Sequence, residues 1–232
     1  MSNLEGKVVL VTGAKGGLGN FVTRALLDAG ARVAGSSRSI QASDFEHPQF
    51  TAIPAGLSTG EAAQKLAGDM IARFGRIDAL VHVMGGFTGG SRVEETDDAS
   101  MERMLDLNFK SAFFTLRAVL PYMRRQGKGR IAVVASRQGV EPGAMVGAYS
   151  ASKAAVVALV RAVALENKDL GISANTVLPG MMDTPANRAF DPKADTSQWV
   201  QPAQVASLLV HLVSDSAAQV TGAAIPIYGA QL

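Results

Sequence analysis

The sequence predicts an α/β protein in which a doubly wound parallel sheet is flanked by helices. Short, continuous apolar runs rich in β-branched residues alternate with longer segments of helical periodicity, the pattern of about seven strands covered on both faces. This alternation implies parallel strands joined by right-handed crossover helices. A chain of 232 residues, 47% of them hydrophobic, can bury one sizeable core, so we expect a single domain over 1–232.

The expected strands are 7–12, 32–35, 50–53, 78–83, 130–135, 172–177 and 223–227. The expected helices are 17–29, 59–74, 99–125, 147–168 and 202–214. Ser58 with Glu61 three residues later predicts a capping box for the second helix, and Pro202 occupies a first helical position. The one long irregular segment, 181–201, predicts a short substrate lid, because long loops in compact domains are usually functional or mobile.

Composition excludes several kinds of partner and site. The net charge of +2 comes from scattered Lys and Arg, which gives no nucleic-acid surface. There is no cysteine, and the polar start MSNLEGK lacks a secretory signal, so we expect a cytoplasmic enzyme or binding protein. The most apolar helical segment, AAVVALVRAVAL, is interrupted by Arg161 and reads as too short to span a membrane.

The end of the first strand reads TGAKGGLG, with Gly13, Gly17 and Gly19 between strand and helix. Ligands of parallel sheets collect beyond the carboxyl ends of the strands. Glycine here permits a tight turn and lets backbone N–H groups approach a pyrophosphate at the helix N-terminus. The pattern predicts a dinucleotide site, although an ordinary strand-to-helix turn has similar glycines.

The end of the second strand favours NADP(H) over NAD(H). An acid is expected there if the ribose 2′-hydroxyl of NAD is bound, but Ser36, Ser37 and Arg38 follow the strand instead. A guanidinium can donate two charge-assisted hydrogen bonds to a 2′-phosphate. Lys15 in the first loop adds a second positive charge, or it is a solvated surface cation.

The fourth strand ends in VHVMGGFTGG. Gly85 and Gly86 permit close passage of a bound dinucleotide, and Met84 and Phe87 offer apolar contact, with core packing as the alternative. His82 lies inside the strand and is expected to be a hydrogen-bonded interior group. The three histidines are isolated from one another, so we expect no metal site.

The fifth strand and the following helix carry the predicted chemistry. Ser136 follows the strand directly, and Tyr149 and Lys153 lie four residues apart, on one helix face. A tyrosine with a pKa of about 10 needs a neighbouring cation for acid–base work near neutral pH, and Lys153 is placed to lower the pKa. Ser136 is expected to orient a substrate carbonyl, and Asn108 to hold a water. Taken alone, a Tyr-x-x-x-Lys usually marks a surface helix.

Together TGAKGGLG, Asn108, Ser136, YSASK and the later LPG resemble the short-chain dehydrogenase/reductase family over nearly the whole chain. The resemblance implies a Rossmann-like fold, a catalytic tetrad of Asn108, Ser136, Tyr149 and Lys153, and a homotetramer or homodimer. It implies that Pro179 and Gly180 line the nicotinamide side and that Thr184 contacts its carboxamide. The cofactor contacts expected in all are Gly13, Lys15, Gly17, Leu18, Gly19, Ser37, Arg38, Leu57, Gly85, Tyr149, Lys153, Pro179, Gly180 and Thr184.

The sequence departs from the family pattern after the fourth strand. The usual Asn-Asn-Ala-Gly appears as His82, Val83, Met84 and Gly85, so a side-chain hydrogen bond that steadies the sheet is absent or replaced. In PAGLS, Gly56 stands where many members have an aspartate, which leaves the adenine to the backbone of Leu57.

The predicted substrate is a small carbonyl or alcohol compound, of ketone or 3-oxoacyl type, bound by Phe87, Ser136 and Trp199. GGFTGG and the segment after Asp183 also resemble dihydropteridine reductases, although these generally lack the serine and prefer NADH. A pteridine-type reductase is therefore the alternative. A further alternative is an NADP(H) sensor without chemistry.

Overall fold

The computed structural model describes residues 3–230, and a seven-stranded parallel sheet forms its centre. The strand order is β3-β2-β1-β4-β5-β6-β7. The chain builds outward from β1 to β3 and then returns, so β1 and β4 are neighbours at the point where the winding reverses. The strands are β1 Val8–Thr12, β2 Arg32–Ser36, β3 Phe50–Ala52, β4 Ala79–His82, β5 Gly129–Val134, β6 Ile172–Pro179 and β7 Ala224–Ile227.

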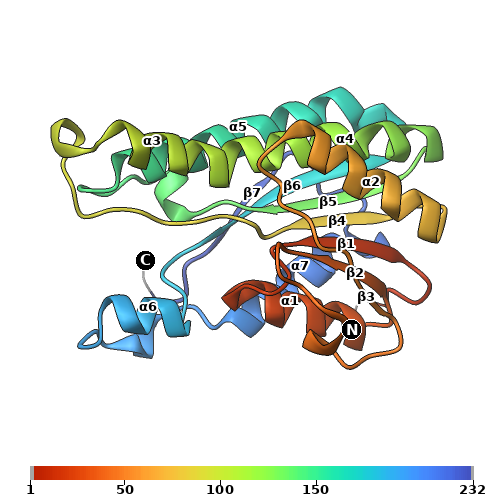
Figure 1. Cartoon of the computed structure of the whole chain (residues 1–232), viewed down its shortest axis with the longest axis horizontal. Helices are drawn as coiled ribbons and strands as arrows, with labels where there is room; N and C mark the ends of the chain where they lie inside the picture. The colour runs from red at the N-terminus through yellow and green to blue at the C-terminus, as the bar shows by residue number, and fades with distance from the viewer. Residues whose placement is uncertain (1–2, 231–232) are drawn as a thin grey trace.

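Helices cover both faces of this sheet, as expected for a doubly wound fold. In Figure 1, α2, α4 and α5 lie on one side of the sheet and α1 and α7 on the other, while α6 lies apart from both layers. The helices are α1 Gly17–Asp28, α2 Gly60–Phe74, α3 Asp98–Met104, α4 Ser111–Gln126, α5 Gly147–Asn167, α6 Pro185–Phe190 and α7 Pro202–Leu212.

Two apolar cores, one on each face of the sheet, hold these layers together. Alternate residues of a strand point to opposite faces, so Leu10 of β1 packs in the core that contains Leu116 of α4. Val11 belongs to the opposite core, with Leu26 of α1 and Leu209 of α7. Burial of both faces explains why the strands read as continuous apolar runs rather than alternating ones.

Two details of the predicted helices are wrong. The cap of α2 is Thr59, whose hydroxyl accepts a hydrogen bond from Ala62 N (3.2 Å), and not Ser58. The helix predicted over 99–125 is divided into α3 and α4 by a π-helical turn, Leu105–Lys110. Such turns interrupt α-helices and frequently lie at functional sites.

The segment 181–201 is more ordered than predicted. Thr184 caps α6 by accepting a hydrogen bond from Asn187 N, and Pro185 occupies the first turn. At the base of the segment, Met182 pairs with Val200 in an isolated β-bridge. The segment therefore has a short helix at its tip and a fixed base.

Helix α5 and the turn after it, 147–170, are long and apolar enough by composition to cross a membrane, which corrects the expectation that this segment is too short. The same composition is expected of a helix that packs on a sheet. Here α5 contacts β6, and Val156, Val160 and Ala164 are buried in the core. The structure thus accounts for these three apolar residues of α5 by packing on the sheet.

Candidate active site

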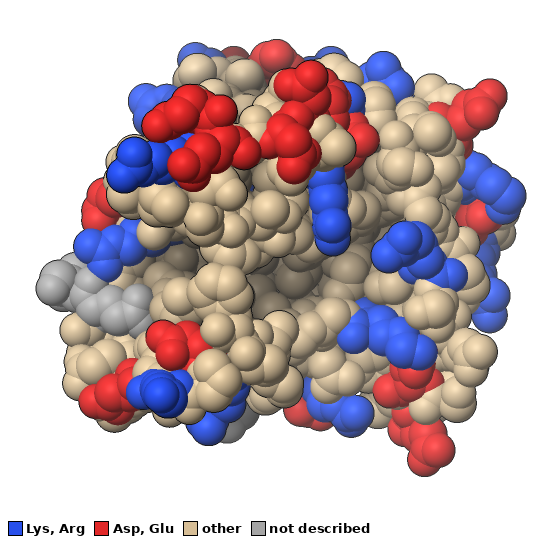
Figure 2. Space-filling view, turned by 60° about the vertical axis from the view of Figure 1, so that its left-hand side comes forward, with Lys and Arg blue, Asp and Glu red and all other residues tan. Residues whose placement is uncertain are grey.

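A cavity of about 1280 Å³ opens at the carboxyl ends of the strands. Pockets for drug-sized ligands measure about 300 to 1,000 Å³, so this one has room for a dinucleotide beside a substrate. Figure 2 shows the molecule hollowed at the centre of this face. The predicted site residues that line it are Gly13, Lys15, Gly17, Leu18, Gly19, Ser37, Arg38, Leu57, Gly85, Phe87, Ser136, Tyr149, Lys153, Pro179 and Gly180. Asn108, Thr184 and Trp199 are not among the lining residues.

The glycine-rich turn after β1 has no room for side chains. Gly13 adopts φ 71°, and a Cβ there would lie 2.8 Å from Met84 N in the loop after β4. A Cβ on Gly19 would overlap the carbonyl oxygen of Gly13. At Gly17, by contrast, the nearest atom to an added Cβ is the Thr184 methyl, at 3.7 Å. The first turn of α1 therefore presents bare backbone to the cavity, which suits a pyrophosphate at a helix N-terminus.

Arg38 and Lys15 lie at the end of β2 with different partners. Arg38 is exposed, and within residues 3–230 it forms no ion pair. Lys15 pairs with Asp44 (2.9 Å) and donates to Ser39 O (3.2 Å). The contact with Lys15 holds the pKa of the Asp44 carboxyl below its usual value. Arg38 is thus the cation better placed to receive a phosphate.

Ser37 and Leu57 complete this end of the cavity. The hydroxyl of Ser37 accepts a hydrogen bond from Lys15 N (3.2 Å) and donates to Ser36 O (2.8 Å). Leu57 is 2% exposed and forms part of the cavity wall. The turn after β1 and the end of β2 are therefore fixed to each other by backbone and hydroxyl contacts.

His82 forms hydrogen bonds that connect β4 to its neighbours, in place of the side-chain hydrogen bond expected from the family pattern. Its Nδ1 lies 2.8 Å from Thr12 Oγ1 of β1, and its Nε2 lies 3.4 Å from Ser111 Oγ of α4. Because Ser111 donates its proton to Leu107 O, the neutral ring accepts at Nδ1 and donates from Nε2. Burial, with Lys153 as a second cause, lowers the pKa of His82 to about 3. The expectation of a hydrogen-bonded interior histidine is confirmed.

Asn108 lies in the π-helical turn, fully buried behind the loop after β4. Its Oδ1 accepts from Gly86 N (3.0 Å), and its Nδ2 donates to Gly86 O (3.1 Å) and Ser152 Oγ (3.0 Å). A Cβ on Gly85 would lie 2.7 Å from Asn108 Oδ1 and 3.1 Å from Lys153 Nζ. Asn108 thus ties the loop to α5 beside Lys153 rather than lining the cavity.

Tyr149 and Lys153 project from α5 toward Ser136. Lys153 Nζ donates to Val134 O (3.1 Å) and lies 6.0 Å from the centroid of the Tyr149 ring. Burial lowers the pKa of Lys153 to about 8. The Ser136 hydroxyl accepts from Gln138 N (3.2 Å) and so caps the short turn that follows β5.

The pKa of Tyr149 does not follow the sequence-based prediction. Burial raises this pKa above its ordinary value, and only the interaction with the Ser136 hydroxyl opposes the increase. This direction is opposite to the lowering expected from Lys153, because desolvation of the phenolate is the largest cause. Tyr149 consequently holds its proton at neutral pH.

Phe190 of α6 lines the cavity, although the sequence analysis did not predict it. Its ring lies 5.8 Å from that of Phe87, which in turn lies 5.0 Å from that of Tyr149. The predicted contact by Trp199 is not supported, because Trp199 follows the turn Thr196–Gln198 at the base of the segment, next to the β-bridge. The Thr-Pro start of α6 was the available signal for a helix that brings Phe190 here.

The fold and the site together define a dinucleotide-dependent oxidoreductase. Residues 7–195 match the model of the short chain dehydrogenase family, so the chain belongs to the short-chain dehydrogenase/reductase family. Members of this class transfer hydride between NAD(P) and CH–OH or C=O groups. The sequence-based prediction of fold and family is therefore confirmed.

Relatives of several kinds match over nearly their whole length. The chain is 30% identical to the 3-oxoacyl-[acyl-carrier-protein] reductase FabG of Vibrio cholerae, with 98% of each chain covered. It is 31% identical to the 2-dehydro-3-deoxy-D-gluconate 5-dehydrogenase of Pseudoalteromonas atlantica, covering 98% of this chain and 96% of that one. The solved structure of gox2181 superposes with a TM-score of 0.91 at 27% identity, covering 99% of this chain and 96% of that one.

Proposed function

We propose that the protein is an NADP(H)-dependent reductase of small carbonyl compounds, with Tyr149 as the general acid. The observation that carries this proposal is the meeting of Tyr149, Ser136 and Lys153 at one wall of the cavity. A site with these groups can bind a carbonyl oxygen between two hydroxyls and supply it with a proton. NADPH supplies the hydride when bound.

The protonation states of the site suit reduction. Tyr149 carries its proton at neutral pH and so can donate it to an oxygen that gains negative charge. Ser136 holds a hydroxyl on the same side and can orient that oxygen. Lys153, with a pKa of about 8, is mostly protonated at neutral pH and stabilises the phenolate that Tyr149 becomes. Alcohol oxidation is the reverse, and it requires Tyr149 to lose its proton first.

Turnover by Tyr149→Phe tests the assignment. We expect this variant to lose at least about a hundredfold in kcat with NADPH and a ketone panel, the contribution of a general acid, while NADPH binding changes little. Tyr122→Phe on α4 is the matched control, since Tyr122 packs against Arg125 and does not line the cavity. Undiminished turnover by Tyr149→Phe would remove Tyr149 from the chemistry.

We infer the preference for NADPH from Arg38. Arg38 forms no ion pair within the part of the chain that the structure describes, and its guanidinium, next to Ser37 at the end of β2, is suited to a 2′-phosphate. Arg38→Asp should weaken NADPH binding by at least about tenfold and improve NADH binding relative to it, as measured by fluorescence titration of both cofactors. An unchanged preference would contradict this assignment. Arg24→Asp on α1 controls for the change of net charge, since Arg24 does not line the cavity.

A pteridine-type reductase is a second candidate, because Phe87 places an aromatic ring beside Tyr149. Ser136 and Arg38 weigh against it. Rapid turnover of quinonoid dihydropterin, with little activity on ketones and 3-oxoacyl thioesters, would make it the better assignment. Binding of NADPH without oxidation by any of these substrates would instead favour a sensor.

We further propose a homotetramer in the cytoplasm, in keeping with the family resemblance. Phe113 on α4 and Leu165 on α5 are large apolar residues that are 38% and 63% exposed. Exposed apolar side chains on the two long helices suit a subunit interface. Light scattering after size-exclusion chromatography tests this, and a monomeric mass would contradict it.

A further inference from the structure

We propose that Phe87 and Phe190 form an aromatic subsite that selects uncharged substrates bearing a flat ring. This inference rests on the proposed carbonyl reduction and names the substrate class of the same site. The Phe87 ring meets the Tyr149 ring edge-on (5.0 Å between centroids, 77° between planes), and the Phe190 ring meets the Phe87 ring similarly (5.8 Å, 85°). Three separate elements, the loop after β4, α5 and α6, thus bring aromatic rings to one place.

The two phenylalanines keep much of their surface uncovered. Phe87 is 48% exposed and Phe190 is 67% exposed, although both line the cavity. Apolar area removed from water contributes about 25 cal/mol per Å², so a ligand that covers these rings is stabilised by doing so. A flat ring gains further from edge-to-face contact, which a puckered ring of the same size cannot make.

The loop that carries Phe87 is shaped to hold the ring in place. A Cβ on Gly89 would lie 2.8 Å from Phe87 Cζ and 2.9 Å from Val146 Cγ1, so the ring packs directly on the glycine backbone. Gly90 N donates to Met145 O (2.8 Å), and Met145 has the unusual φ of 64° for a residue with a side chain. Backbone in this conformation is often found at ligand sites.

The charges around the subsite disfavour an anionic substrate. The charged residues that line the cavity are Lys15, Arg38, Lys153 and Arg137. The first two lie at the cofactor end, and Lys153 is buried behind the Tyr149 ring. Arg137 is paired with Glu141 (2.7 Å) and lies over the Tyr228 ring (4.7 Å). Within residues 3–230, each cation near the rings has an acidic or structural partner. None is therefore available to bind a carboxylate or a phosphate of the substrate.

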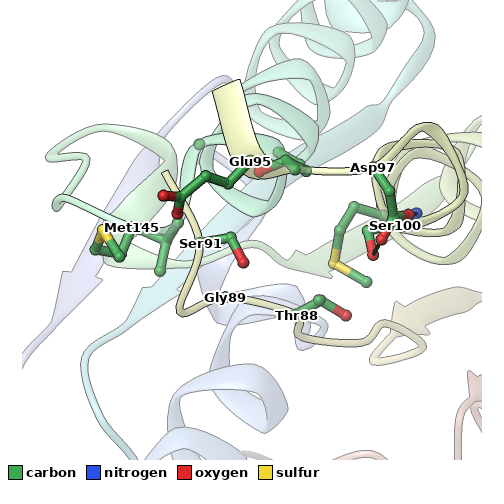
Figure 3. Close-up of a pocket in the computed structure, with 12 residues that line it drawn as sticks. Thr88, Gly89, Ser91, Glu95, Asp97, Ser100 and Met145 are labelled. Carbon is green, nitrogen blue, oxygen red and sulfur yellow. Dashed lines mark hydrogen bonds between the residues drawn. The ribbon is translucent and has the colours of Figure 1, made fainter. Parts of the chain in front are cut away.

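Acidic residues lie beside this end of the cavity. A small neighbouring pocket of about 40 Å³ shares Met145 and Val146 with the large cavity and is lined by Glu95 and Asp97. Figure 3 shows the side chain of Glu95 extending toward Ser91 and Met145. In Figure 2, acidic groups gather above the hollow, whereas Lys and Arg side chains lie to its right. These carboxylates disfavour a negative charge on the substrate at this end of the cavity.

Two matched pairs of ketones test the subsite. Acetophenone and cyclohexyl methyl ketone differ in a flat against a puckered ring, and methyl benzoylformate and benzoylformate differ in charge. We expect higher kcat/KM for acetophenone and for the neutral ester. Phe190→Ala should lower kcat/KM for acetophenone by about 3- to 10-fold, mainly through KM, and change it for cyclohexyl methyl ketone by less than about 2-fold.

Leu170→Ala is the control, because Leu170 is 42% exposed and lies just before the amino end of β6, at the opposite end of the strands from the cavity. Gly89→Ala is a second variant: its added Cβ would meet Phe87 and Val146, so we expect it to displace the Phe87 ring and to reduce the same preference. Equal loss of both ring types in Phe190→Ala, or benzoylformate used as well as its ester, overturns the inference.

A binding measurement separates this inference from the proposed function. Saturation-transfer NMR of acetophenone with Tyr149→Phe and NADP⁺ reports binding without turnover. If no ketone is reduced but this binding depends on Phe190, carbonyl reduction is wrong and the aromatic subsite stands. If ketones are reduced but binding is the same in the Phe190→Ala background, the subsite is wrong and the reaction stands.

Discussion

Nδ1 of His82 lies 2.8 Å from Oγ1 of Thr12, so the two central strands β1 and β4 are joined by side chains directly below the cavity. The neutral form of the ring is favoured, since both nitrogens have hydrogen-bond partners and the residue is 1% exposed. Its pKa of about 3 follows from this burial.

We therefore predict that His82 makes the fold sensitive to acid. The pKa is lowered on folding, so the unfolded chain binds this proton first, and stability falls as pH drops below about 6.5 toward about 3. His82→Asn should be less stable at pH 7.5 but lose about 1 to 2 kcal/mol less than the wild type between pH 7.5 and 5.0. Urea unfolding at both pH values measures this, and parallel losses would contradict it.

Lys153 should make cofactor binding depend on pH above neutrality. Because burial lowers its pKa to about 8, its positive charge is present at pH 7 and is lost as pH rises through 8. We expect the affinity for NADPH to fall by up to about tenfold per pH unit above 8, until the pKa of the complex is passed. Fluorescence titrations from pH 7 to 9.5 measure the effect. Lys153→Gln should bind more weakly at pH 7 and show a flat profile.

Gly19 should tolerate no side chain. An added Cβ overlaps Gly13 O, so Gly19→Ala must displace the turn that faces the dinucleotide. We expect NADPH binding to weaken by at least about tenfold, as measured by calorimetry. Gly68→Ala in α2 is the control: nothing lies within 4 Å of its added Cβ, and it should raise stability by about 0.5 to 1 kcal/mol with unchanged binding. Normal cofactor affinity in Gly19→Ala would contradict the close packing.

Asp44 should compete with the cofactor for Lys15. The two side chains pair at 2.9 Å, and Lys15 is 42% exposed, so their attraction is partly screened. Asp44→Asn releases Lys15 and removes the negative charge beside it. We expect NADPH to bind about 2- to 5-fold more tightly at low salt, with NADH unaffected. Asp28→Asn in α1 controls for the change in net charge. Equal effects on both cofactors would show that Lys15 does not meet the 2′-phosphate.

The strands and most helices could be predicted from sequence because their signals are local. Residues 8–11 and 131–135 are continuous apolar runs, and both are buried on both faces as such runs require. The glycines of the first turn were predictable for the same reason, since each answers a backbone requirement within a few residues. Tyr149 and Lys153 could be paired from their spacing alone on one helix.

The remaining features depend on contacts between distant segments. The sequence predicts that Asn108 holds a water in the site, because no sequence pattern shows that its side-chain amide is hydrogen-bonded to Gly86 and Ser152. The pKa of Tyr149 depends on how completely neighbours exclude water, which spacing does not reveal. Phe190 was missed because the segment 181–201 reads as irregular, and its approach to Phe87 exists only in the folded chain.

The wide turn at Leu105–Lys110 limits how this chain can change in length. Each residue of a helix advances about 100° around its axis, so deleting one residue there would rotate everything before it by that angle relative to α4. Met104, now completely buried, would face another direction. The loop that bears Phe87 would lose the hydrogen bonds between Gly86 and Asn108. Descendants of this sequence can therefore be expected to gain and lose residues near 191–196, but hardly ever here.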